Sequence, residues 1–135
     1  MTTSTTNRKQ RTITLSRRAP VKIWEDEWPI AAQATGDSYR GGDHGGYQRA
    51  LSNAEFDKYR LVVRVHADGR AIVYGKLSAA IEEWGQPARG ASWGGGEILP
   101  AGSDLAAAIS RVGGDGGLPD SLIRECIADL PAEEI

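Results

Sequence analysis

The sequence has little of what marks several large protein classes. Its 135 residues include one cysteine, Cys126, which excludes an internal disulfide and a cysteine-rich zinc site. No apolar run approaches the roughly 20 residues that cross a bilayer, and the N-terminus lacks the apolar segment of a secretory signal. Together these absences predict a cytoplasmic protein with no membrane partner.

The sequence also lacks a large excess of either sign of charge, since the formal net charge is −2 at pH 7. This value argues against a domain that holds nucleic acid mainly by its overall charge, although a local basic patch can still do so. The length fits one domain. Residues 1–10 are polar, rich in threonine and without a hydrophobic period. We therefore predict a disordered basic tail over 1–10 and a single domain over 11–135.

The strongest pattern predicts a central β-hairpin with strands at about 58–66 and 70–77. Asp68-Gly69 suits the two central positions of a type I′ turn, which would pair Val65 with Ile72. In this register one face is basic and the other is the core face. The basic face carries Arg60, Arg64 and His66, and the core face carries Tyr59, Leu61, Val63, Val65, Ile72 and Tyr74.

Other segments before the C-terminal part have weaker patterns. Alternating apolar residues indicate short strands, capping residues such as Asp26 and Ser78 favour short helices, and glycine clusters indicate loops. The predicted strands are 12–15, 20–24 and 97–99, the predicted helices 27–34 and 79–84, and the predicted loops 35–47 and 85–96.

Two amphipathic helices are predicted at the C-terminal end, at about 104–112 and 119–129. Ser103 suits the N-cap of the first, Gly113-Gly114 ends its pattern, and Pro119 lies at the start of the second. Their joint apolar surface requires cover, and the core face of the hairpin offers it. The predicted fold is α+β, with a small antiparallel sheet built on the hairpin and packed against two helices.

Motifs for catalysis are missing. The glycine clusters match neither a dinucleotide fingerprint nor a phosphate-binding P-loop, and Ser92 does not stand in a nucleophile elbow. Cys126 lies on the apolar face of the last helix and is predicted to be a core residue. Asp43 and His44 could form an acid/base pair or hold a metal, so a small metal-dependent enzyme stays an alternative. We predict no catalytic residue and no cofactor.

Two sets of residues are candidates for binding. Aromatic and polar side chains of the two glycine-rich segments suit a protein partner. Arginines of the N-terminal arm and the hairpin suit nucleic acid, although the predicted register turns Tyr59 and Tyr74 away from them. The first set is Tyr39, Arg40, Asp43, His44, Tyr47, Trp84 and Trp93, and the second is Arg17, Arg18, Arg60, Arg64 and Arg70.

The segments 21–29, 66–74 and 118–131 resemble those of small, uncharacterised accessory proteins carried on plasmids and integrated mobile elements of proteobacteria. This resemblance implies no site residues. It implies a setting in which small proteins inhibit host machinery, including restriction and CRISPR systems.

The leading functional hypothesis is therefore a non-enzymatic cytoplasmic interaction protein, an accessory or anti-defence factor that binds a host or element-encoded protein. A nucleic-acid-binding regulator is the first alternative, and the small metal-dependent enzyme is the second.

Overall fold

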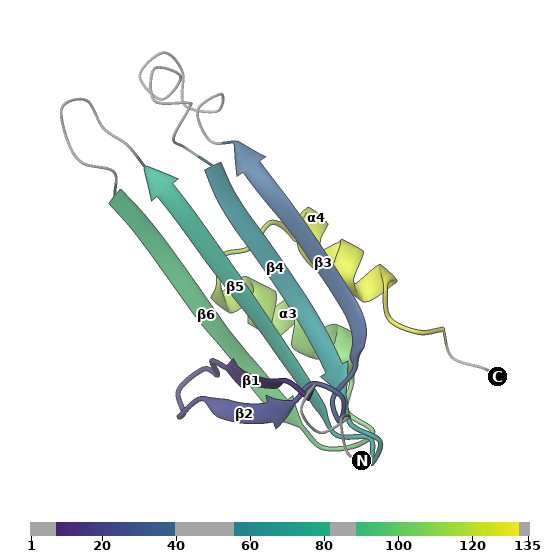
Figure 1. Cartoon of the computed structure of the whole chain (residues 1–135). Helices are drawn as coiled ribbons and strands as arrows, with labels where there is room; N and C mark the ends of the chain where they lie inside the picture. The colour runs from purple at the N-terminus through teal and green to yellow at the C-terminus, as the bar shows by residue number, and fades with distance from the viewer. Residues whose placement is uncertain (1–7, 40–55, 82–88, 133–135) are drawn as a thin grey trace.

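Four long antiparallel strands form the centre of the molecule (Figure 1). The structure is a computed structural model that describes residues 8–39, 56–81 and 89–132. The strands follow one another in chain order as a meander. They are β3 (Ile30–Tyr39), β4 (Phe56–Val65), β5 (Ala71–Ile81) and β6 (Arg89–Leu99).

Two helices cover one face of this sheet, and a small hairpin crosses the other. Helix α3 (Leu105–Asp115) packs against β4, β5 and β6, and α4 (Asp120–Ala128) packs against β3 and β4. On the opposite face, β1 (Gln10–Ile13) and β2 (Val21–Trp24) pair with each other and lie across one end of the sheet. The predicted α+β fold and both C-terminal helices are confirmed. Within the described residues, neither helix is long and apolar enough to cross a membrane.

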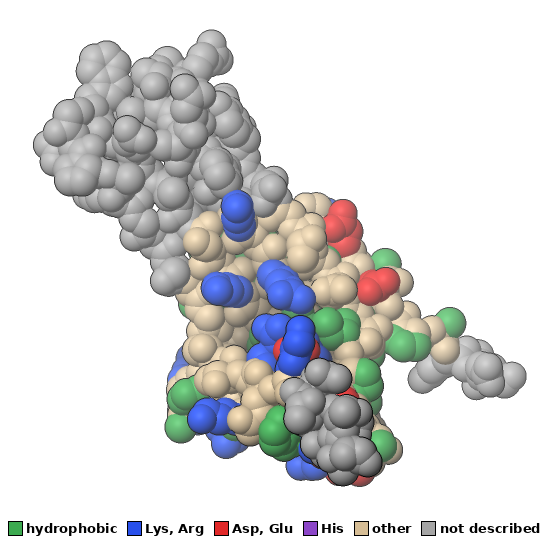
Figure 2. Space-filling view, in the orientation of Figure 1, with side chains coloured by type: hydrophobic (Ala, Val, Ile, Leu, Met, Phe, Trp, Pro, Cys, Tyr) green, Lys and Arg blue, Asp and Glu red, His purple; other side chains and the backbone are tan. Residues whose placement is uncertain are grey.

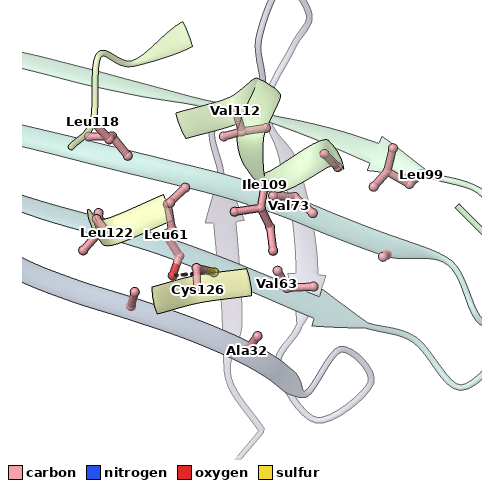
Figure 3. Close-up of a cluster of buried hydrophobic side chains, with 13 residues drawn as sticks. Ala32, Leu61, Val63, Val73, Leu99, Ile109, Val112, Leu118, Leu122 and Cys126 are labelled. Carbon is pink, nitrogen blue, oxygen red and sulfur yellow. Dashed lines mark hydrogen bonds between the residues drawn. The ribbon is translucent and has the colours of Figure 1, made fainter. Parts of the chain in front are cut away.

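The main core lies between the sheet and the helices (Figure 3). Its buried residues on β3, β4 and β5 are alternate residues of each strand, as expected for a sheet with one face covered by helices. Small side chains on β3 bring α4 close, and an added Cβ at Gly36 would lie 3.5 Å from Leu122. The buried members are Ala32, Ala34, Leu61, Val63, Ala71, Val73, Leu99, Ala108, Ile109, Val112, Leu118, Leu122 and Cys126.

A second, smaller core lies under the β1–β2 hairpin. Ile13 and Ile23 from the two short strands pack with Trp28 on Ile72 of β5. Leu15 completes the buried set, and Tyr74 and Ile98 flank it. Both faces of the sheet are therefore buried at this end. Trp28 is a buried residue of this core, with an exposed fraction of 8%.

The predicted hairpin is present, but its predicted register is wrong by one residue. Val65 pairs with Ala71 and Arg64 with Ile72. The Gly69 amide donates to the His66 carbonyl, and Gly69 has φ +95°. These are the marks of a three-residue loop, a type I turn followed by a left-handed glycine, in place of a two-residue type I′ turn. A shift of one residue moves one strand's side chains to the other face, so Ile72 and Tyr74 share the face of Arg60 and Arg64.

The loop holds Asp68 in a tight set of hydrogen bonds. The Arg70 backbone N–H donates to the Asp68 carboxylate at 3.0 Å, and the Arg70 guanidinium lies 2.8 Å from it. These contacts hold the pKa of Asp68 below its usual value. His66 is half-buried beside the Trp28 ring, at 4.9 Å between centroids.

Both short helices predicted before the C-terminal part are wrong. Residues 25–28 form turns, and the chain from Ile30 pairs with β4, because Pro29 disfavours helix at the residue before it. The segment after Ser78 continues β5 to Ile81. Thr35–Tyr39 belongs to β3, and 89–96 belongs to β6, so these parts of the predicted loops are also wrong.

The first C-terminal helix differs from its prediction at both ends. Asp104 is the N-cap, with its carboxylate accepting from the Ala107 amide at 3.1 Å. The helix also runs through Gly113-Gly114 to Asp115. Gly113 faces α4, and an added Cβ there would lie 2.5 Å from Ile123 Cγ1, whereas Gly114 has open space around it. Only the first of these glycines is required by packing.

This contrast gives a matched pair of substitutions. Gly113→Ala should lower the free energy of unfolding by about 1–3 kcal/mol, because the methyl group overpacks the α3–α4 contact. Gly114→Ala should raise it by about 0.5–1 kcal/mol, because alanine lowers the entropy cost of helix formation and meets nothing. Urea unfolding of both variants measures the difference. A Gly113→Ala variant that is at least as stable as the native protein would contradict the packing described for Gly113.

Candidate functional site

The face of the sheet opposite the helices carries a group of basic side chains on β4 and β5. Arg60 of β4 pairs with Lys76 of β5 in the strand register, and Lys58 is one alternate position further along β4. Figure 2 shows Lys and Arg side chains gathered on this face, beyond the β1–β2 hairpin. Like charges directly opposite each other on neighbouring strands are destabilising. Arg60 and Lys76 therefore form a position where a bound anion would relieve repulsion.

The hairpin turns this part of the face into a cleft. Strand β1 stands beside Arg60 and Lys76, and a cavity of about 350 Å³ lies between them. We call it the basic cleft. The residues that give it charge, hydroxyl groups and an aromatic ring are Arg11, Thr12, Thr14, Arg60, Tyr74 and Lys76.

A second hollow continues from the basic cleft along the open face. Its volume is about 680 Å³, and Arg60 and Lys76 line both spaces. Thr35, Lys58 and Ser78 lie further along it. No Asp or Glu is among the described residues that line either hollow. The two hollows together form a continuous track whose described charged side chains are all positive.

The cations of the basic cleft differ in how they are held. Arg11 is paired with Glu25 at 2.9 Å. Arg60 donates from Nη2 to the Gln33 side chain at 3.3 Å, whereas its Nε is buried and has no hydrogen-bond partner in the described chain. An unpaired buried donor normally costs about 1–3 kcal/mol. Lys76 is exposed. Arg60 thus has an unused hydrogen-bonding group, and Lys76 has room to move toward a ligand.

Arg64 does not join this surface, contrary to its predicted place on an exposed basic face. Its exposed fraction is 3%. Its Nε donates to the Tyr74 hydroxyl at 3.0 Å and its Nη1 to the Trp28 carbonyl at 2.9 Å. Arg64 therefore ties the turn before β3 to β5 and fixes Tyr74 at the wall of the basic cleft.

The other predicted arginines lie apart from the basic cleft. Arg17 and Arg18 are exposed in the β1–β2 connection, where Arg17 has φ 59°. Arg70 is paired with Asp68 and lies over the Trp28 ring at 5.1 Å. The predicted patch of Arg60, Arg64 and Arg70 is therefore not a single surface, and only Arg60 of this group lines the basic cleft.

Most of the residues predicted to bind a protein partner lie outside the described residues. These are Arg40, Asp43, His44, Tyr47 and Trp84, so the metal-dependent enzyme at Asp43 and His44 also stays a prediction. Tyr39 ends β3, opposite Phe56 in the register. Trp93 stands on β6 and packs against the main core on the helix-covered side, beside Gly75 and Gly116.

Several residues of the basic cleft were not singled out from the sequence. Lys76 follows the alternation of the hairpin strands, as does Lys58 in the adjoining hollow, so a correct register would have placed both with Arg60. Arg11, Thr12 and Thr14 carry no such signal, because their place depends on how the β1–β2 hairpin packs on the sheet. Tyr74 was assigned to the core face by the register error.

Cys126 is a core residue, as predicted. It is fully buried, and its Sγ lies 4.0 Å from the Leu61 carbonyl oxygen (Figure 3). Burial, reinforced by the negative charge of Asp129, raises the pKa of the thiol to about 11. The thiol stays protonated at neutral pH, and this makes Cys126 a poor nucleophile.

The raised pKa predicts a loss of stability at alkaline pH. The unfolded thiol releases its proton near pH 8.5 and the folded one near 11, so the unfolded state holds fewer protons between these values. Stability therefore falls as pH rises through this window, by roughly 2–3 kcal/mol. Urea unfolding at pH 8 and pH 11 should show this fall in the native protein in excess of that in Cys126→Ala. Equal falls in both proteins would contradict it.

No protein-family model matches the chain, and neither the curated proteins nor the solved structures include one with significant similarity to it.

Proposed function

We propose that the protein binds nucleic acid, with the phosphate backbone lying along the basic cleft and the hollow that continues from it. The observation that carries this proposal is the direct cross-strand pairing of Arg60 with Lys76 in two adjoining hollows, which no Asp or Glu lines among the residues whose side chains are described. The sheet holds the two residues opposite each other on neighbouring strands. A phosphate group between them replaces repulsion with attraction and meets the hydroxyl groups of Thr12 and Thr14.

The shape of the track favours a polymer over a single small anion. Two adjoining hollows share Arg60 and Lys76, and basic side chains continue to Lys58 beyond them. A free phosphate would occupy one part of this length, whereas successive phosphates of a chain would occupy all of it. The net charge of −2 means that such binding comes from the local surface and not from the whole protein. The protein-partner hypothesis stays a prediction, and its residues lie largely elsewhere.

The test compares two variants that each remove one positive charge. Lys76→Gln changes the track, and Arg124→Gln changes an exposed position on α4, on the helix side of the sheet. Fluorescence anisotropy with a labelled 20-nucleotide strand should show affinity that falls as salt rises from 50 to 200 mM. Lys76→Gln should weaken binding about fivefold to tenfold and make the salt slope shallower by about 0.7. Arg124→Gln should change affinity less than twofold.

Two outcomes would remove the proposal. One is no binding by the native protein at 50 mM salt. The other is an equal loss in Lys76→Gln and Arg124→Gln, which would indicate attraction by overall charge. Thermal unfolding of both variants checks that they are folded, and we expect them to stay within about 0.5 kcal/mol of the native protein because both positions are exposed.

A further inference from the structure

We infer that the nucleic acid bound in the basic cleft is single-stranded. This inference rests on the proposed function and adds the class of ligand. Its first support is the shape of the site. The β1–β2 hairpin is seated on the sheet through Ile13, Ile23 and Ile72, so β1 forms a wall and the cleft is the inner corner at its foot. Arg60, whose buried Nε has no hydrogen-bond partner among the described residues, lines this corner.

A corner of this size distinguishes a double helix from a single strand, because the two differ in curvature and stiffness. A double helix is a convex cylinder with a persistence length of about 150 base pairs, so it does not bend into a cavity of about 350 Å³. A single strand is flexible and can place one sugar-phosphate unit at the foot of the wall and the next in the adjoining hollow. Gly94 opens the floor of the cleft, because it has no side chain there. Tyr74 of β5 also lines the cleft, and its ring offers an aromatic surface to a base.

The placement of the helices gives a second, independent argument. Proteins that read duplex DNA usually insert a helix or a β-ribbon into the major groove. Here α3 and α4 lie on the face of the sheet away from the basic cleft, and the β1–β2 hairpin has one face buried against the sheet. The helix layer also carries exposed carboxylates that repel phosphate. Those residues are Asp104, Asp115, Asp120, Glu125 and Asp129.

A cleft-filling variant tests the site without changing its charge. An added Cβ at Gly94 would make ordinary contact with Thr14, at 3.5 Å, so a side chain fits at this position and projects into the cleft. Gly94→Gln should therefore stay folded and weaken single-strand binding at least fivefold, while the salt slope stays unchanged. Gly102→Gln is not a suitable control, because Gly102 has φ +85°. Gly114→Gln, at the open position on α3, is the matched control and should bind as the native protein does.

The deciding experiment compares one 20-nucleotide strand with its own duplex, as DNA and as RNA, by anisotropy at 50 mM salt. We expect each strand to bind at least tenfold more tightly than its duplex, and Gly94→Gln to reduce that preference. Equal or tighter duplex binding that Lys76→Gln weakens and Arg124→Gln does not would overturn the inference, while the proposed function would stand. No binding of either form would overturn both. Strand preference that Gly94→Gln leaves unchanged would move the site away from the basic cleft.

Discussion

Trp93→Ala is expected to lower the free energy of unfolding by about 2–4 kcal/mol. The indole ring lies on the helix-covered side of β6 and fills the space beside two glycines. An added Cβ at Gly75 would come 3.0 Å from the ring, and one at Gly116 would collide with it. Removing a packed aromatic ring leaves a cavity between α3 and the sheet, and such losses cost about 3–5 kcal/mol when the ring is fully buried. Trp93 is half-buried, so we expect a lower value. Urea unfolding measures it.

Trp24→Ala is the matched control for this prediction. Trp24 is a half-buried residue of β2 whose ring lies under the Arg8 guanidinium at 4.2 Å. It is outside both buried clusters, so its removal should cost less than about 1 kcal/mol. Similar stabilities for Trp93→Ala and the native protein would show that the ring does not support the core. Trp93 would then fit the role of a partner-binding anchor that its glycine-rich surroundings suggest.

The C-terminal helices could be predicted because each has an apolar face on one side only. Leu105, Ala108, Ile109 and Val112 recur with the helical period, and all four face the sheet or its margin. The helix end was not predictable from Gly113-Gly114, because glycine is unfavourable in a helix unless a neighbour requires its small size. Here the neighbour is Ile123 of α4, a contact that depends on tertiary packing.

For the hairpin of β4 and β5, the sequence predicts the position but not the register. Its position follows from two β-rich runs around Asp68-Gly69, but this dipeptide suits both a two-residue turn and a loop with Gly69 in the left-handed region. The choice between them decides the face of Ile72 and Tyr74. Only the β1–β2 hairpin, which buries Ile72 from the other side, distinguishes the two registers. Strand β3 and the part of β6 before residue 97 were missed for a related reason, because alanine and glycine carry no hydrophobic alternation.

The make-up of the candidate site also depends on the register and on long-range packing. Arg60 was singled out from the sequence, but its partner Lys76 follows only from the observed register, and Arg11 only from the packing of β1. Arg64 is buried, and its hydrogen bonds to Trp28 and Tyr74 likewise join residues far apart in the sequence. Charge alone therefore indicated a basic surface on the sheet, whereas long-range contacts decided which cations share one cleft.

Ile13→Ala is expected to lower the stability of the β1–β2 hairpin by about 2–4 kcal/mol and to weaken nucleic-acid binding. Ile13 has an exposed fraction of 2% and packs in the small core with Ile72, so truncation leaves a cavity in a cluster with few other members. The loss should fall on this hairpin and not on the main sheet. Hydrogen exchange of the Ser16 amide, which donates to the Gly96 carbonyl at 2.9 Å, should become about 30-fold faster or more.

The conservative change Ile13→Val keeps most of the packing and should cost only about 0.5–1.5 kcal/mol. If the wall of the basic cleft is needed for binding, affinity for a single strand should fall in the order native, Ile13→Val, Ile13→Ala, with every charged residue retained. The amides of the main core under α3 and α4 should keep their exchange rates in both variants, because Ile13 belongs to the separate small core. Unchanged Ser16 exchange in Ile13→Ala would mean that the hairpin is held by other contacts. Unchanged affinity for a single strand together with faster exchange of the Ser16 amide would mean that the wall is not needed for binding.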